Sequence, residues 1–347
     1  MLYYHGDGLA RDIHKAARLI QTAAAYGDAN ARQAMRQDDL SKAWQEALKA
    51  EQDALREEFI RRADQTGAAA WYELGKAYEE GDQGLLQDKA QAADWYRKAA
   101  EQKNTDAMFA LARMYDTGDG LPQGKKKALD LYLKVADSYS SAAADAMLAL
   151  WRMYDTGDGV EQDKKKALDW LLRAAKDSHV EAMRRLGLLY AEGSDLVERD
   201  GVLAALLYSK ASEKGDGEAS FLLACQLDAG NGKSQNNAKA LVLYHKAAQL
   251  NYPPAAYRLG KIYSRGEGVD PDLEQAAFWF QRAAEQGNAD AQYALGQLYA
   301  DGYGVPRDLH EAARWYRKAA ELGNEDARMA LQREDIRKAH EENVTAR

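Results

Sequence analysis

The sequence contains a single cysteine, Cys225, in a chain of 347 residues. One cysteine excludes an internal disulfide framework and any zinc site built from cysteines. No apolar run approaches the roughly 18 residues needed to span a bilayer, and no secretory signal segment follows Met1. An excess of basic residues is also lacking: the formal net charge is −8, whereas nucleic-acid-binding proteins normally carry a basic face. The sequence therefore predicts a soluble protein that binds no nucleic acid and inserts in no membrane.

Proline is scarce as well, with 5 residues, while 46% of the residues are hydrophobic and 29% are charged. This composition is typical of a folded, helix-rich chain and not of a disordered one. Tyrosine (20) and tryptophan (7) outnumber phenylalanine (5), so most aromatic side chains have a polar tip and suit half-buried positions.

One pattern recurs along most of the chain: an alanine, a leucine four residues later and a glycine eleven residues later. Successive leucines are separated by 36 to 39 residues. The leucines are Leu74, Leu111, Leu150, Leu186, Leu223, Leu259 and Leu295, and the alanines are Ala70, Ala107, Ala146, Ala182, Ala219, Ala255 and Ala291. The glycines are Gly81, Gly118, Gly157, Gly193, Gly230, Gly266 and Gly302. A fixed period of this length predicts a helical repeat protein.

Each repeat is expected to contain two helices. If the alanine is position 0, helix A carries Ala at 0, Leu at +4, a small residue at +5 and Tyr at +8, which together form one amphipathic stripe. The glycine at +11 then ends helix A in a left-handed conformation. Helix B is clearest in EAARWYRKAAELGN (Glu311–Asn324), where Ala, Trp and Tyr fall on one face. The sequence therefore predicts an all-α solenoid of antiparallel helix pairs.

The heptapeptide MYDTGDG occurs twice, at Met114–Gly120 and Met153–Gly159, and could be mistaken for a pair of ligand-binding loops. A calcium loop needs several oxygen ligands and a distant bidentate glutamate. Here lysines follow, and every other repeat has its turn at the same place. We interpret both copies as turns between helices A and B.

The segment ADAQYALGQLYADGYGVPRDLHEAARWYRKAAELGNEDA (Ala289–Ala327) resembles the Sel-one-like repeat, a relative of the tetratricopeptide repeat. The resemblance implies a right-handed superhelix with a concave surface that binds a protein or peptide partner. Bacterial members of the family serve as adaptors, host-interaction factors, envelope-assembly proteins and immunity proteins against secreted toxins.

The repeats predict four divisions of the chain. Residues 1–28 are expected to be a half repeat with a turn and helix B, and a missing upstream segment or another cap could cover its exposed end. Residues 29–68 are a divergent repeat whose charged stretch 36–59 is either a fused helix or a protruding contact element. Residues 69–324 hold seven regular repeats, and residues 325–347 a capping helix and tail.

Helix A has a second face, at positions −1, +2, +6 and +9, that lies opposite its packing stripe. The candidate partner-binding residues are the aromatics and cations of positions +2 and +6: Tyr72, Lys76, Phe109, Arg113, Arg152, Arg184, Phe221, Tyr257, Lys261 and Tyr293. Aromatic residues and arginine commonly dominate binding energies. Position +9 is acidic in several repeats, as in Asp116 and Asp155. Alternatively, the +2 aromatics pack against the adjacent repeat.

The lysine runs 125–127 and 164–166 are expected to be solvated.

Enzyme chemistry finds little support in the sequence. The six histidines are scattered over different repeats without a metal-binding spacing, and no phosphate-binding glycine loop or Ser-x-x-Lys motif occurs. We expect Cys225 to be structural or incidental, because no histidine is near it in the sequence. We therefore predict no catalytic residues, no metal and no cofactor.

The leading hypothesis is a non-catalytic adaptor that holds a protein or peptide in the concave surface. The alternative is an immunity protein that neutralises a cognate secreted bacterial toxin, such as a type VI secretion effector. A hydrolase of cell-wall or lactam substrates is the remaining enzyme alternative. The compartment stays open: the chain reads as cytoplasmic, and a periplasmic or secreted processed form would fit its start in the middle of a repeat.

Overall fold

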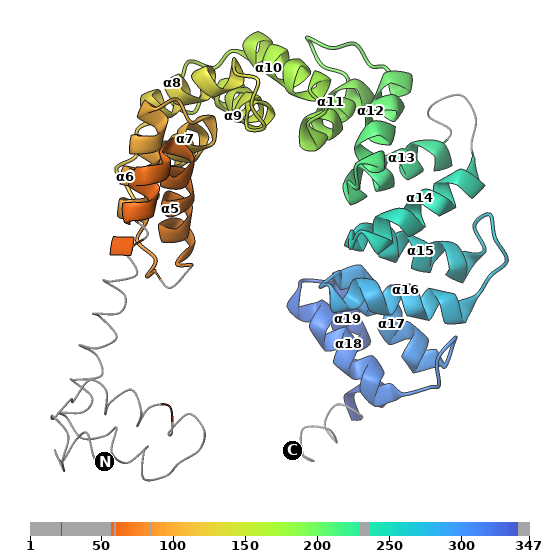
Figure 1. The fold of residues 1–347 in the computed structure, drawn as a ribbon. Coiled ribbons are helices and arrows are strands. Elements are labelled where there is room, and N and C mark those ends of the chain that lie inside the picture. The colour runs from red at the N-terminus through yellow and green to blue at the C-terminus, as the bar shows by residue number, and fades with distance from the viewer. Residues whose placement is uncertain (1–21, 23–56, 59, 83–84, 230–235, 339–347) are drawn as a thin grey trace, which may run out of the picture. The chain divides into compact units, whose positions relative to one another are not determined.

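The computed structural model describes residues 22, 57–58, 60–82, 85–229 and 236–338. Within these residues the chain consists of α-helices that pack in consecutive pairs, which confirms the predicted all-α solenoid fold. The chain divides into two compact units, unit 1 (residues 1–167) and unit 2 (residues 168–347). Figure 1 gives the order of the helices.

Several predictions fall on other residues. The half repeat at 1–28 lies outside the described part of the chain except for residue 22. The choice between a fused helix and a protruding element at 36–59 does so except for residues 57–58, and Gly230 also lies outside. Of the divergent repeat, residues 57–58 and 60–68 are described, and all of these except Gly67 are helical.

Unit 1 contains helices of type A and type B in alternation. Their bounds are α5 (Ala68–Glu80), α6 (Lys89–Glu101), α7 (Thr105–Thr117), α8 (Lys125–Ala136) and α9 (Ala143–Thr156). Helix α5 packs on α6, α7 packs on α8, and neighbouring pairs meet through α6 with α7 and α8 with α9. Helix α10 (Lys164–Lys176) contains residues of both units.

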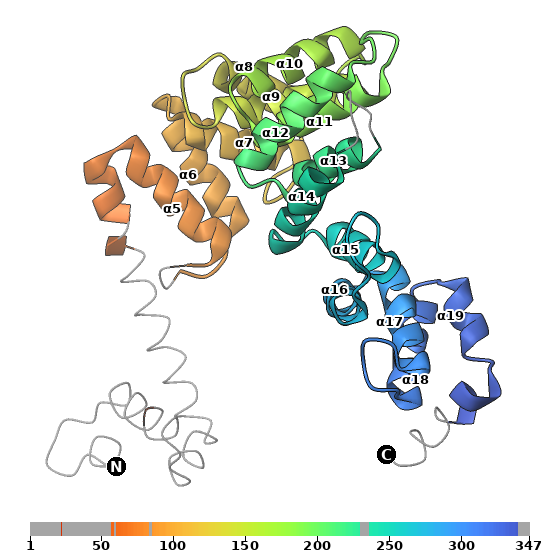
Figure 2. The same cartoon turned by 90° about the vertical axis from the view of Figure 1, so that its right-hand side faces the viewer.

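Unit 2 continues the alternation. Its helices are α11 (Val180–Glu192), α12 (Gly201–Glu213), α13 (Gly217–Asp228), α14 (Asn237–Gln249), α15 (Pro253–Arg265), α16 (Leu273–Glu285), α17 (Ala289–Asp301), α18 (Leu309–Glu321) and α19 (Glu325–Ala330). Figure 2 shows α15 beside α16 and α17 beside α18, and both pairs are in contact.

Several helices of type A begin at a polar cap, whereas α5, α9 and α15 have no side-chain cap. The side-chain oxygen of Asn288 accepts a hydrogen bond from the backbone N–H of Ala291 at 2.8 Å, and Asn104 caps Ala107 at the same distance. A side chain at this position satisfies one of the backbone donors that a helix start leaves unpaired. In α7 and α17 the repeat's alanine, Ala107 or Ala291, is therefore the third residue of helix A, where it is fully buried.

Glycine at +11 closes helix A. Gly302 has φ 75° and ψ 35°, and its N–H donates to the carbonyl of Leu298 at 2.8 Å. A side chain is disfavoured in this left-handed conformation, which explains the glycine. Gly193 shares the positive φ (77°), but its ψ of 164° leads into a longer turn that contains an isolated bridge between Ser194 and Val197.

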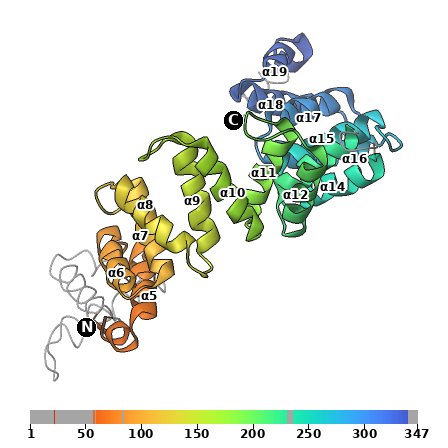
Figure 3. The same ribbon diagram turned by 90° about the horizontal axis from the view of Figure 1, so that it is seen from above.

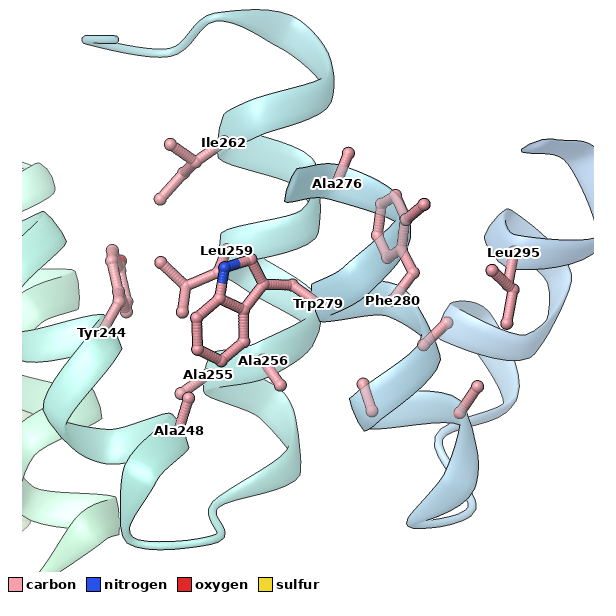
Figure 4. Packing of buried hydrophobic residues seen from close by; sticks show 14 of the residues in the cluster. Tyr244, Ala248, Ala255, Ala256, Leu259, Ile262, Ala276, Trp279, Phe280 and Leu295 are labelled. Carbon is pink, nitrogen blue, oxygen red and sulfur yellow. The ribbon is translucent and has the colours of Figure 1, made fainter. Parts of the chain in front are cut away.

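Large aromatic rings fill the spaces between the closely packed alanine-rich helices. In unit 2, Trp279 of α16 lies beside Leu259 of α15 and faces Tyr244 of α14 (Figure 4). Ala255 and Ala256 lie next to the ring and are buried, so that the helix backbones come close together.

The C-terminal segment was expected to be one polar capping helix. Helix α19 has six residues, and after a turn a second helical stretch follows at residues 334–338. Ile336 in this stretch is fully buried in the cluster that contains Tyr316 and Ala327. Figure 3 shows α19 next to α18, with which it is in contact. One apolar residue within a polar sequence thus covers the end of unit 2.

Candidate protein-binding surface

The aromatic residues at position +2 stack on buried aromatic residues of helix B in their own repeat. Their ring centroids lie 5.6 to 5.8 Å apart in five pairs: Tyr72–Tyr96, Phe109–Tyr132, Phe221–Tyr244, Tyr257–Phe280 and Tyr293–Tyr316. The helix-B rings are buried, whereas the +2 rings are half-buried. Each +2 aromatic is thus held in place by the core and still exposes part of its ring.

Cations at position +6 and carboxylates at position +9 form ion pairs between consecutive repeats of unit 1. The guanidinium of Arg113 donates to Oε1 of Glu79 at 2.6 Å. In the next repeat Arg152 makes the equivalent ion pair with Asp116. Both arginine side chains remain more than half exposed. The sequence analysis treated positions +6 and +9 as separate sets of residues, and the structure pairs the two sets between consecutive repeats.

Asp116 was expected to face the groove, but its side chain is only 2% exposed. The ammonium group of Lys125 donates to its Oδ1 at 2.7 Å, Arg152 pairs with Oδ2, and the Tyr132 hydroxyl is 3.5 Å from the same oxygen. These groups cover the carboxylate and compensate its lost hydration. Asp116 is therefore a structural residue.

The expectation that the lysine run 125–127 is solvated is wrong for Lys125. Its side chain is 22% exposed, and besides Asp116 it binds Asp158 at 2.5 Å. Burial opposes the charge of Lys125, but the two carboxylates outweigh burial and raise the pKa of this amine above its usual value. In the second run Lys164 and Lys166 are 55% and 62% exposed, as expected.

Two candidate residues in unit 2 have partners within the chain. Arg184 is 18% exposed and donates to Asp216 at 3.0 Å, and it also pairs with Glu218 at 2.5 Å. Because these two carboxylates neutralise its charge within unit 2, we leave Arg184 out of the proposed surface below. Lys261 lies over the ring of Tyr257, 5.6 Å from its centroid.

A cavity of about 630 Å³ lies on the helix-A side of unit 1. Four of the predicted residues line it: Tyr72, Lys76, Phe109 and Arg113. We call this cavity the unit 1 groove. Residues that the sequence analysis did not single out also line it, among them Asp106 at position −1 and Ser141 in the turn before α9. The other six predicted residues lie elsewhere in the fold.

Tyr72 and Tyr96 of the unit 1 groove lie close to the carboxylates Asp106 and Glu79. Burial raises the pKa of the Tyr72 phenol, and the negative charge of Asp106 raises it further. Burial also raises the pKa of Tyr96, whose hydroxyl donates to Oε2 of Glu79 at 2.7 Å. Both phenols therefore stay neutral at physiological pH and can donate hydrogen bonds.

A smaller cavity of about 480 Å³ in unit 2 contains Cys225. The Tyr244 hydroxyl lies 3.5 Å from its Sγ, and Arg258 nearby pairs with Asp228 at 2.5 Å and with Glu267 at 2.7 Å. Burial raises the pKa of the Cys225 thiol. This cysteine is thus held as a thiol by its surroundings.

Within the described ranges, no group of three or more His, Cys, Asp and Glu side chains is placed to hold a metal ion. In the same part of the chain, no helix combines the length and the apolar character that a membrane crossing requires.

A family model described as the Sel1 repeat matches residues 1–28, 68–104, 105–139, 142–179, 180–216, 217–252, 253–288 and 289–324. These matches cover most of the chain. A search of curated proteins gave no match.

Several solved structures resemble this chain. A Sel1 repeat protein from Oxalobacter formigenes is 31% identical with a TM-score of 0.66, over 91% of this chain and 89% of that one. A protective antigen of uropathogenic Escherichia coli with an SLR fold is 28% identical with a TM-score of 0.66 over 95% of this chain, which spans 62% of the antigen's length. The immunity protein Pa5087 from Pseudomonas aeruginosa is 25% identical over 63% of this chain and 81% of that one, with a TM-score of only 0.41.

Proposed function

This chain belongs to the Sel1 repeat family, and we propose that it is a non-catalytic interaction module that binds a protein or peptide partner in the unit 1 groove. The observation that supports the proposal is the convergence of Tyr72, Lys76, Phe109 and Arg113 on one cavity. A row of half-buried aromatics beside charged residues provides both the apolar contact and the polar contacts that protein recognition uses.

The groove is suited to binding because its walls are already fixed. Tyr72 and Phe109 stack on the buried rings of Tyr96 and Tyr132, and Arg113 is held by Glu79. Side chains that are ordered before the partner arrives lose little conformational entropy on binding. We propose that the partner contributes a segment that lies along the groove in an extended conformation.

A steric block tests the proposal without touching the core. Ser141 is exposed and lines the groove, so Ser141→Trp should fill it. Lys134, exposed on α8 and outside the lining, gives the matched control Lys134→Trp. Affinity capture from the native cell with the wild type and both variants should yield a partner that Ser141→Trp loses and Lys134→Trp retains. If every captured protein binds Ser141→Trp as well as wild type, the groove is not the binding site.

The immunity protein remains the specific alternative that the family resemblance suggests, and the similarity to Pa5087 is too weak in structure to support it. The two roles differ in affinity. An inhibitor of a toxin must hold a globular protein at nanomolar or tighter Kd, whereas an adaptor that binds an extended segment works in the micromolar range. Titration of the captured partner distinguishes them.

A further inference from the structure

All three cations that line the unit 1 groove are held by carboxylates of this chain. Arg113 pairs with Glu79 at 2.6 Å, and Lys76 lies 4.0 Å from Glu80. Lys89 pairs at 2.7 Å with Asp119, which is not part of the lining. The exposed cations alone would favour an acidic partner, but their charges are already neutralised.

Asp106 differs from these residues. It lines the groove, is half-buried, and has no ion-pair partner in the described part of the chain. Its Oδ1 accepts a hydrogen bond from the Ser141 hydroxyl at 3.5 Å. The three cations of the groove are held by Glu79, Glu80 and Asp119 and not by Asp106. Asp106 therefore leaves a negative charge open in the groove.

The acids at position −1 of three other repeats are engaged. Asp290 on α17 accepts a hydrogen bond from the Asn324 amide at 2.9 Å, Glu218 pairs with Arg184 at 2.5 Å, and Glu181 pairs with Arg185 at 2.5 Å. Among these positions, Asp106 alone combines an open carboxylate with two half-buried aromatic neighbours in one cavity, Tyr72 and Phe109.

We infer that the unit 1 groove takes a basic extended segment of the partner, with an arginine side chain entering between Tyr72 and Phe109 to meet the carboxylate of Asp106. This inference rests on the proposed function of the groove. A guanidinium suits the site because its flat face stacks on aromatic rings while its edge donates two hydrogen bonds to a carboxylate. The ion pair is then formed in a half-buried place, where it is less screened than at the open surface.

The test uses two labelled peptides of about eight residues, one with arginine and one with glutamate at every second position, and the full-length chain. We expect the arginine peptide to bind and the glutamate peptide not to bind. Asp106→Asn should weaken binding of the arginine peptide about tenfold, since the neutral amide no longer offers a charged acceptor to the guanidinium. Raising the salt concentration should weaken binding to the wild type more than to Asp106→Asn.

Asp290→Asn is the matched control, because both aspartates occupy the second residue of a helix A behind an asparagine cap. It should bind the arginine peptide as wild type does. If Asp106→Asn and Asp290→Asn bind this peptide equally, or if the glutamate peptide binds better, the groove does not take a basic segment. Ser141→Trp separates the two proposals: if it blocks the natural partner while Asp106→Asn does not weaken that partner, the groove is the binding site and the inferred partner chemistry is wrong.

Discussion

The ring of Tyr316 on α18 lies directly over the backbone of Gly296 on α17. A β-carbon on Gly296 would lie 2.7 Å from two atoms of that ring. Three other repeats show the same contact, between Gly75 and Tyr96, Gly187 and Tyr208, and Gly260 and Phe280. In these four repeats the glycine at +5 of helix A is therefore the place where the large ring of helix B packs.

Gly296→Ala should consequently destabilise unit 2, although alanine favours a helix more than glycine does. The gain in helix propensity is at most about 1 kcal/mol, whereas forcing a methyl group against a buried ring costs about 1–3 kcal/mol. We expect a net loss of about 1 kcal/mol, measured as a lower urea midpoint and a lower Tm.

The double variant with Tyr316→Leu supplies the control, since Leu171 stands at the equivalent place in α10. A smaller side chain makes room for the new methyl group, so the cost of Gly296→Ala should largely disappear in the Tyr316→Leu background. A cost that is the same in both backgrounds would show that the ring contact is not its cause.

Asp116→Asn should destabilise unit 1. The substitution leaves Lys125 and Arg152 without the carboxylate that they share and places a neutral amide at a site that is 2% exposed. Removal of one partner from a buried ion pair costs about 3–5 kcal/mol, and because both cations reach solvent we expect about 1–2 kcal/mol here. Thermal unfolding measures the difference.

Asp155→Asn is the matched control for Asp116→Asn, because the two aspartates occupy the same place in identical heptapeptides. Asp155 is 33% exposed and pairs with Lys164, which is 55% exposed. Its replacement should cost less than about 0.5 kcal/mol, as is usual for exposed pairs. Equal losses for the two variants would contradict the structural role of Asp116.

These two aspartates also show why the sequence predicted the repeats and not the ion pairs. The heptapeptide determines the turn in both copies, because the glycine at +11 ends helix A within a few residues. Burial of Asp116 depends instead on Arg152, 36 residues later. The residue at that position in the following repeat is Leu188, which cannot form an ion pair. Such contacts depend on how neighbouring repeats are spaced, and the period alone does not reveal this.

For the candidate surface, too, the sequence predicted the positions of the residues but not their ion pairs. Helical periodicity put Tyr72, Phe109 and Arg113 on one face of helix A, and the structure places them around one cavity. The periodicity could not show that Arg113 is neutralised by Glu79 while Asp106 is not neutralised. Charged side chains at the same position of different repeats thus differ in whether they can bind a partner, because some are neutralised by a charge of the neighbouring repeat and others are not.

His245 should make unit 2 sensitive to acid. Its ring lies 5.1 Å from that of Trp279, and its Nε2 is hydrogen-bonded to the Tyr263 hydroxyl at 3.0 Å. Burial lowers the pKa of His245 below its usual 6.5. The unfolded chain then binds the proton more readily than the folded chain, so stability should fall as the pH drops from about 6.5 through the folded-state pKa.

Comparison of pH profiles isolates this contribution. His245→Gln, which keeps a polar group near Tyr263, should flatten the decline in Tm between about pH 6.5 and pH 5, whereas His310→Gln, at an exposed position on α18, should leave the decline unchanged. Parallel profiles for wild type and His245→Gln would place the acid sensitivity elsewhere.

Cys225 should react slowly in the folded protein. Burial raises its pKa, although the Tyr244 hydroxyl and the Arg258 charge act in the opposite direction, so the reactive thiolate is rare near pH 8. Alkylation by iodoacetamide at about pH 8 should therefore be about tenfold slower in the native chain than in urea, where the thiol regains its ordinary pKa. Because the chain has one cysteine, each modified molecule gains a single adduct that mass spectrometry counts directly.

Tyr244→Phe removes the hydroxyl that stabilises the thiolate and should slow native alkylation further. If native and unfolded chains react at the same rate, the thiol is not protected by its cavity.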